Sequence, residues 1–143
     1  MADLDFAILA DYARVENGLG YLIAGGLDRI RVAEVPRTQN VGLLMRLLFT
    51  LGEADRTHRL EVIVLDADGT RLREVGASVT PRVPLDHTPG RKLQMMSSIN
   101  FGIPIPSYGS YSIEVVLDNV SIKTIPIDVV PVDEPANTAP TPD

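Results

Sequence analysis

The sequence predicts an all-β fold, an antiparallel β-sandwich of about eight strands with little helix. Two observations predict it. Short apolar runs with two-residue alternation fill most of the 143 residues, and turn signals separate them roughly every ten to fifteen residues. No segment keeps the apolar spacing of an amphipathic helix for more than about two turns. An open β-barrel built from the same strands is the alternative.

Three turn signals predict β-hairpins. They are Asn17-Gly18-Leu19-Gly20, Asp66-Ala67-Asp68-Gly69 and Asp118-Asn119. Each lies between runs rich in Val, Ile, Leu and Tyr, and Asn, Asp and Gly accept the positive φ that tight hairpin turns require. The second signal also resembles the start of a calcium loop, but the later oxygen ligands of such a loop are missing, so we expect a hairpin turn.

Two strands can be assigned from their alternation. In the run 110–118 the apolar positions share one face: Tyr111, Ile113, Val115 and Leu117. That strand is expected to be half buried. The run 41–51 is apolar on both faces, because Leu44 and Leu48 lie on the face that carries Arg46. It predicts a central strand, or one with a face under a partner.

The residues before the first of these strands predict a sheet-to-sheet corner. Gly109 stands two residues before Tyr111, and prolines at 104 and 106 precede them. This is the setting of a tyrosine corner, in which the phenol bonds an upstream backbone group. Gly109 and Tyr111 are therefore expected to be structural, and the corner favours a sandwich of the immunoglobulin or C2 type.

The chain divides into one predicted domain, 1–132, and a tail, 133–143. The tail is acidic and proline-rich and has no large apolar side chain, so it is expected to be disordered. Its three acidic residues make up half of the formal net charge of -6. The domain surface is thus less acidic than the whole chain.

Composition excludes several classes of function. There is no cysteine and there are only two histidines, so we expect no disulfide, no thiolate nucleophile, no metal site and no cofactor. The chain is acidic and has no basic stripe, which argues against nucleic acid and membrane surfaces as partners. No apolar run approaches the ~20 residues of a spanning helix, and the first residues lack the features of a secretory signal. Cytoplasmic residence is expected.

The loop 81–91 is the longest irregular segment, with three prolines and a glycine. It is either a crossover between sheets or a functional loop. Arg82, Asp86 and His87 are its candidate ligand or partner contacts. No nucleophile motif such as G-x-S-x-G accompanies them, so no catalytic residue is predicted. The other histidine, His58, lies among arginines at a turn and is expected to be exposed, like His87.

Met96 is a further candidate partner contact. Met95 and Met96 are adjacent in a strand and point to opposite faces. If Met96 or Leu48 is exposed on a flat strand, adaptable apolar side chains there would suit a partner surface. The alternative is that both faces are covered within the fold.

Several motifs resemble those of a family of small bacterial proteins known only as a domain of unknown function. They are LADYA at 9–13, GGLDRI at 25–30, the Pro106 to Tyr111 segment and TIPI at 124–127. The resemblance extends over about residues 4–130. It implies no activity, and no functional residue can be carried over from it.

The sequence therefore favours a non-enzymatic protein-interaction or assembly module that acts through edge strands or an apolar sheet face. Its partner would be another protein or a second copy. The reasons are the missing catalytic set, the 45% hydrophobic content and the edges that a sandwich must cover or use. One alternative is a ligand-binding or enzymatic domain that uses the 81–91 loop. Another is a structural component of a phage-like or other particle.

Overall fold

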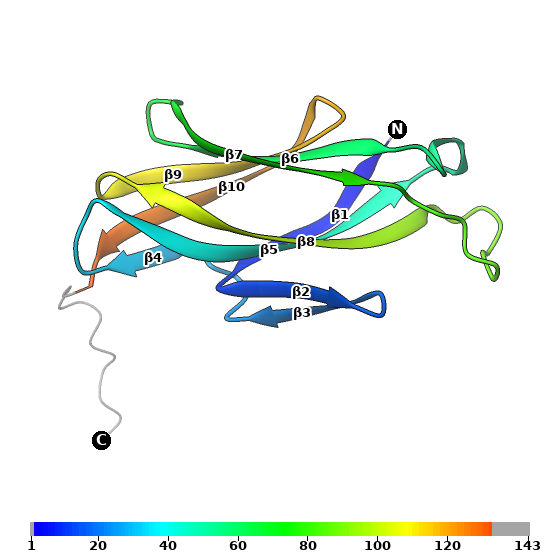
Figure 1. Ribbon diagram of the computed structural model, residues 1–143, viewed down its shortest axis with the longest axis horizontal. Coiled ribbons are helices and arrows are strands. Elements are labelled where there is room, and N and C mark those ends of the chain that lie inside the picture. The colour runs from blue at the N-terminus through cyan, green and yellow to red at the C-terminus, as the bar shows by residue number, and fades with distance from the viewer. Residues whose placement is uncertain (1, 133–143) are drawn as a thin grey trace, which may run out of the picture.

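The computed structural model describes residues 2–132 and confirms the all-β sandwich (Figure 1). The strands are β1 Asp3–Ala10, β2 Tyr12–Glu16, β3 Leu19–Ile23, β4 Arg29–Val32, β5 Arg37–Phe49, β6 His58–Leu65, β7 Arg71–Val79, β8 Leu93–Ile105, β9 Gly109–Leu117 and β10 Val120–Pro131. One short 3₁₀ turn, η1 Leu51–Glu53, follows β5. None of the described residues forms a helix of the length and apolarity that crossing a membrane requires. The predicted tail 133–143 lies outside the described residues.

Two sheets face each other. One has the strand order β1-β5-β8 and the other β4-β10-β9-β6-β7. Two details differ from the prediction. The described chain has ten strands, because residues 3–32 are divided into four short strands. The pairing of β4 with β10 is parallel, since β4 runs along the sheet edge in the direction of the final strand rather than turning back on a sequence neighbour.

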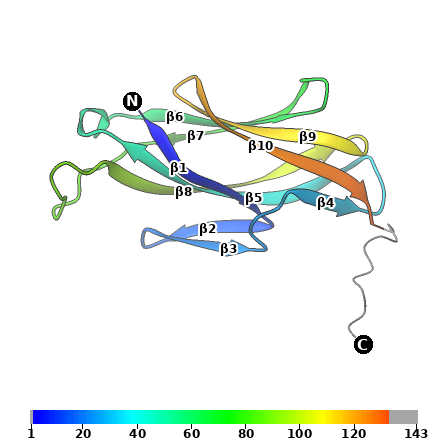
Figure 2. The same ribbon diagram turned by 180° about the vertical axis from the view of Figure 1, so that it is seen from behind.

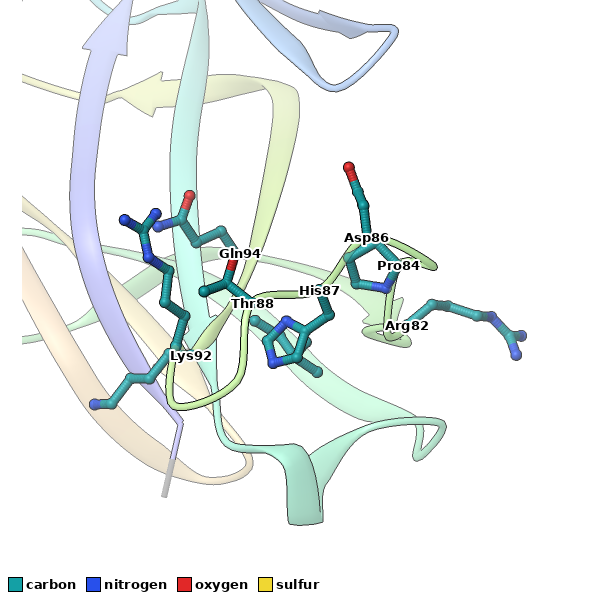
Figure 3. Close-up of a pocket in the computed structure, with 9 residues that line it drawn as sticks. Arg82, Pro84, Asp86, His87, Thr88, Lys92 and Gln94 are labelled. Carbon is teal, nitrogen blue, oxygen red and sulfur yellow. The ribbon is translucent and has the colours of Figure 1, made fainter.

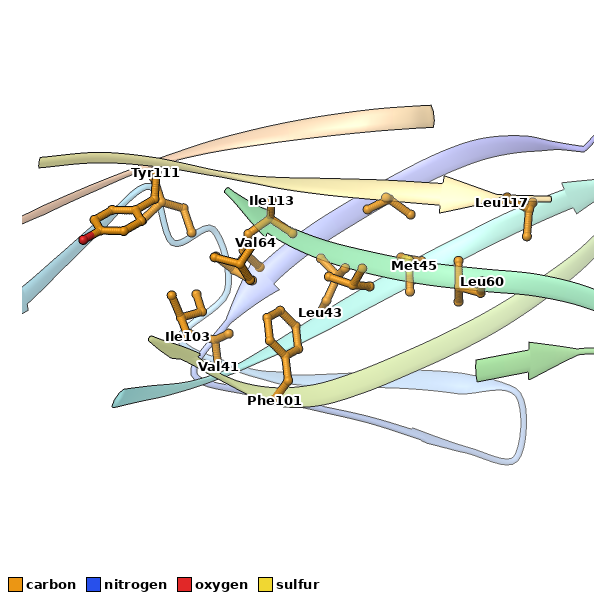
Figure 4. Close-up of a cluster of buried hydrophobic side chains, with 14 of the residues drawn as sticks. Val41, Leu43, Met45, Leu60, Val64, Phe101, Ile103, Tyr111, Ile113 and Leu117 are labelled. Carbon is orange, nitrogen blue, oxygen red and sulfur yellow. The ribbon is translucent and has the colours of Figure 1, made fainter. Parts of the chain in front are cut away.

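The core fills the space between the sheets (Figure 4). It is built from alternate positions of the facing strands, as the two-residue period of a strand requires. The side chains labelled in Figure 4 are Val41, Leu43, Met45, Leu60, Val64, Phe101, Ile103, Tyr111, Ile113 and Leu117. Each fully buried aliphatic side chain contributes roughly 1.5–3 kcal/mol of transfer free energy. The core therefore holds the two sheets together without a disulfide, since the chain has no cysteine.

All three predicted hairpins are present: β2–β3, β6–β7 and β9–β10. Asn17 and Gly18 have φ of 53° and 74°, and Asp118 and Asn119 have 49° and 66°. In the middle hairpin, the Asp66 carboxylate accepts the N–H groups of two following residues at 2.9 Å. These two hydrogen bonds confirm that residues 66–69 form a hairpin turn, which the Asp66 side chain stabilises.

The outer faces of the two sheets differ. Charged side chains lie on the outer face of the five-stranded sheet: Arg59, Glu61, Glu74 and Glu114. The outer face of the three-stranded sheet is mostly apolar, with Phe6, Ile8, Leu44, Leu48 and Met96 around Arg46. The β2–β3 hairpin lies against this face in both views (Figures 1 and 2). β5 is the middle strand of its sheet and is covered on both faces, which confirms the prediction of a central strand for residues 41–49. Leu51 lies beyond the strand, in η1, and is 53% exposed.

Candidate functional site

The β2–β3 hairpin is fixed to the sandwich through its backbone. The Asn100 side chain accepts the Ala13 N–H at Oδ1, 3.0 Å away, and donates from Nδ2 to the Ala13 carbonyl at 2.7 Å. Gly42 lies directly beneath, and a Cβ there would stand 2.4 Å from the Ala13 nitrogen. Only glycine lets the two backbones come this close. A two-stranded hairpin, marginal by itself, is thereby held in one position.

The inner side of the hairpin covers the apolar outer face of the sheet. A Cβ on Gly20 would lie 2.5 Å from Leu44 and 2.6 Å from the methyl carbon of Met96. Leu44 is only 4% exposed as a result. Met96, a predicted candidate partner contact, and Leu48 are both half buried. Met96 is thus covered by a strand of its own chain.

The outer face of the hairpin is the most apolar exposed region among the described residues. Its exposed fractions are 45% for Tyr12, 63% for Leu19, 47% for Tyr21 and 61% for Ile23. The register pairs Tyr12 with Ile23, Arg14 with Tyr21 and Glu16 with Leu19, so these side chains share one face. We call this set of six residues the hairpin face.

The hairpin face is not predicted by the sequence. The alternation was present, since Leu19, Tyr21 and Ile23 have one parity. However, Leu22 has the opposite parity, so either side could have been the buried one. The contact of Gly20 with the sheet decides the matter, and this contact depends on tertiary structure.

The two charged residues of the hairpin face neutralise each other. The Arg14 guanidinium lies 5.4 Å from the centre of the Tyr21 ring and 2.9 Å from the Glu16 carboxylate. Both charged side chains are more than half exposed, so their bridge contributes about 0–1 kcal/mol. They can exchange partners at low cost when another surface approaches.

One edge of the hairpin is open. Within residues 2–132, β3 pairs with β2 alone, and it is the strand farthest from the sandwich in both views (Figures 1 and 2). The two-residue turn makes Glu16 and Leu19 a hydrogen-bonded pair, and such pairs alternate along the ladder. The N–H and C=O groups of Gly20 and Leu22 therefore point away from β2.

The 81–91 loop joins β7 of one sheet to β8 of the other, which confirms a crossover. It borders a cavity of about 400 Å³ whose lining includes Arg82, Asp86 and His87 (Figure 3). Arg82 points away from the other two, and its guanidinium lies 3.3 Å from the Asp55 carboxylate. Nε2 of His87 is buried without a hydrogen-bond partner. The three predicted residues thus line one cavity, but Arg82 is turned toward Asp55.

The expectation that His58 is exposed is wrong. His58 opens β6 with the same parity as the buried Leu60, and it is 6% exposed. Its Nδ1 lies 2.5 Å from Asp118 Oδ2, and its Nε2 lies 3.0 Å from the carbonyl of Glu53. Both ring nitrogens face oxygen acceptors, so the site favours the doubly protonated imidazolium.

These contacts shift the ionisation of the pair. Burial opposes the charged form of His58, but the bonds to the Glu53 carbonyl and to Asp118 outweigh it and raise the pKa of the imidazole. Burial likewise opposes the charged form of Asp118, but the bonds from His58 and the Arg59 N–H lower the pKa of its carboxyl. The pair joins β6 to the β9–β10 turn and is structural.

Tyr111 has the contact expected of a tyrosine corner. It is buried, and its hydroxyl donates to the Ser107 carbonyl at 2.5 Å. Gly109, with φ of 142°, adopts a conformation that other residues avoid. Both residues lie where the chain passes from β8 in one sheet to β9 in the other. Within residues 2–132, no three His, Cys, Asp or Glu side chains gather closely enough to hold a metal ion.

Comparison with known proteins gives a family but no function. Residues 5–130 match the model of a family described as "Family of unknown function (DUF6941)", which confirms the resemblance to a domain of unknown function. No curated protein matches the sequence.

Two solved structures are similar to this chain at low sequence identity. An immunoglobulin-like protein from Pseudomonas aeruginosa is 13% identical over 90% of this chain and 96% of its own, with a TM-score of 0.47. The CARDB domain of a Pyrococcus furiosus protein, crystallised with di-metal ions, is 16% identical over 73% of this chain and 86% of its own, with a TM-score of 0.45.

Proposed function

The chain belongs to the family of unknown function DUF6941, and because membership assigns no activity, we propose a role from its own surface: a non-enzymatic protein-interaction module that binds through the hairpin face. The observation that carries the proposal is the exposure of Tyr12, Leu19, Tyr21 and Ile23 on one side of one hairpin. Single exposed apolar residues are common on protein surfaces, whereas a contiguous group marks a contact surface.

The composition of the hairpin face supports a protein partner. Tyrosine and arginine are enriched at the centres of protein interfaces, where they bury large areas and retain polar groups for hydrogen bonds. Here two tyrosines and Arg14 stand beside two aliphatic side chains. Arg14 already stacks on Tyr21, so part of the contact surface is ordered before a partner binds.

The anchoring of the hairpin supports the same role. The Asn100 side chain forms two hydrogen bonds with the backbone of Ala13, and Gly42 leaves room for that residue. A surface held rigid before binding loses less entropy in the complex. These contacts fix the inner side of the hairpin and leave the outer side to solvent.

The 81–91 cavity has less support as a ligand or catalytic site. The cationic groups around it do not converge on one point, since Arg82 and Lys92 extend in different directions (Figure 3). A site that binds a small ligand places its polar groups around the same ligand atoms.

Site-specific photocrosslinking in cells that naturally express the protein tests the proposal. A benzophenone amino acid replaces Tyr21 in one variant and Thr124, on the outer face of the five-stranded sheet, in a matched control. We expect a discrete crosslinked protein from position 21 and none from position 124. Equal or absent crosslinking at the two positions would overturn the hairpin face as the contact surface.

A further inference from the structure

We propose that the partner is a second copy of this chain, bound by two-fold antiparallel pairing of β3 with β3 of the copy. This inference rests on the proposed function, because it uses the same hairpin. It adds the identity of the partner and the register of the contact. Three features of the molecule support such pairing: the open edge of β3, the side-chain pairs that the register creates and the protection of the other sheet edges.

The open edge supplies the backbone bonds. The N–H and C=O groups of Gly20 and Leu22 point away from β2, as the hairpin register requires. If Tyr21 lies on the two-fold axis, Gly20 of each copy is opposite Leu22 of the other. Those two residues then form hydrogen-bonded pairs, and Tyr21 takes the close, non-hydrogen-bonded position between them.

The same register matches apolar side chains. Tyr21 lies opposite Tyr21 of the copy, and Leu19 lies opposite Ile23 of the copy. All of these side chains are on the exposed side of the hairpin. Residues 19–23 include no charged residue, so the pairing brings no like charges together, which is what destabilises many strand pairs.

The hairpin face has no net charge. The hairpin face carries one arginine, Arg14, and one glutamate, Glu16, which neutralise each other. The chain as a whole has a formal charge of -6, so two copies repel each other weakly at most other orientations. A neutral contact surface is the part of the molecule where that repulsion is smallest.

The other sheet edges are protected against such pairing. Charged residues lie on the edge strands β1, β4 and β7: Asp3, Asp5, Arg29, Arg31, Arg71 and Arg73. β8 carries Pro104 and contacts β7. β2, the other edge of the hairpin, carries Arg14 and Glu16, and the Asn100 amide bonds the Ala13 N–H and C=O there. Charges and prolines on edge strands are the usual protection against strand addition. β3 has neither, so among the described strands it is the edge left open.

The two-fold contact closes on itself. Each β3 has one free edge, and pairing uses both free edges at once, so the assembly ends at two copies. The product is a four-stranded sheet, β2-β3 of one copy continued by β3-β2 of the other. Across the two-fold axis, the exposed Leu19, Tyr21 and Ile23 side chains of each copy contact those of the other.

A charge-pairing experiment tests the register. In the variant Leu19→Lys/Ile23→Lys, each introduced ammonium group faces another across the two-fold axis. In the matched variant Leu19→Lys/Ile23→Glu, each ammonium group faces a carboxylate across the axis, and both variants have the same substitution opposite Glu16 within the hairpin. Light scattering on full-length protein, over a concentration series, should give twice the 15.5 kDa chain mass for the unaltered protein and the mixed-charge variant. It should give a single-chain mass for the all-lysine variant. Circular dichroism checks that both variants fold.

Three results would overturn the inference: a monomeric unaltered protein at high micromolar concentration, two variants with the same oligomeric state, or an all-lysine variant that dimerises. Photocrosslinking separates this failure from failure of the proposed function. A monomer that crosslinks to a different protein at position 21 keeps the hairpin face as a contact surface and removes the second copy as its partner. A monomer that crosslinks to nothing removes both.

Discussion

Nδ1 of His58 lies 2.5 Å from the Asp118 carboxylate and links the first residue of β6 to the β9–β10 turn, sixty positions along the chain. The pKa of His58 is raised from 6.5, so its contribution to stability is full below that value and is lost as pH rises through the folded pKa. The pKa of Asp118 is lowered from 3.8, so its contribution is full above that value and is lost as pH falls through the folded pKa. The pair stabilises most between about pH 4 and 6.5.

Asp118→Asn tests this pair. Asparagine tolerates the positive φ of 49° at this position and still accepts the Arg59 N–H, so the change removes mainly the charge. Urea denaturation at about pH 5.5 should show a loss of about 1 kcal/mol, with little loss at about pH 8.5. Asp118 is almost half exposed, which keeps the expected loss small. The control, Asp68→Asn in the β6–β7 turn, should have the pH profile of the unaltered protein. If the stability of Asp118→Asn had the same pH profile as that of the unaltered protein, His58 and Asp118 would not act as an ion pair.

Gly42→Ala should release the hairpin from the sandwich. A Cβ at this position would lie 2.4 Å from the Ala13 nitrogen and 2.5 Å from Asn100 Oδ1, so the hairpin must move outward. We expect a loss of about 2 kcal/mol in the free energy of unfolding. Compared with the unaltered protein, amide hydrogen exchange should become faster in β2 and β3 and change less in β9. In the control, Gly52→Ala, the nearest atom would be 3.9 Å away, and both measurements should stay unchanged. Unchanged exchange in the hairpin of Gly42→Ala would refute the anchoring.

Tyr111→Phe should weaken the corner between the two sheets. It removes the hydroxyl that donates to the Ser107 carbonyl at 2.5 Å and leaves the ring in the core. The expected loss is about 1 kcal/mol by chemical denaturation. Tyr108→Phe serves for comparison, because the Tyr108 hydroxyl bonds the Val32 carbonyl at a longer 3.3 Å and the residue is more exposed. A larger loss for Tyr108→Phe would contradict the role given to Tyr111.

Local chemistry made much of the fold predictable. Asn17, Gly18, Asp118 and Asn119 adopt the positive φ that their residue types favour, and this locates two hairpins before any contact is known. The two-sided apolar pattern of 41–51 likewise indicated a strand covered on both faces. These signals depend on a residue and its immediate neighbours, so the sequence is enough to interpret them.

Long-range contacts explain what the sequence did not predict. The parallel pairing of β4 with β10 joins segments about a hundred residues apart, and no local pattern specifies it. His58 was assigned to the surface because of the arginines around it, although its parity with Leu60 indicated the core. The hairpin face depends on Gly20 meeting Leu44. Of the predicted contact residues, Met96 lies under that hairpin, and the 81–91 set lines a separate cavity.

Amide hydrogen exchange at low and high protein concentration tests the pairing of β3 with β3 itself, because it reports on the backbone groups that would pair. We expect the N–H groups of Gly20 and Leu22 to exchange quickly in dilute protein and more slowly as the protein concentration rises. The N–H groups of Leu19 and Tyr21 already bond within the hairpin and should change less. Exchange at Gly20 and Leu22 that is independent of concentration, or new protection confined to β7 or β8, would contradict it.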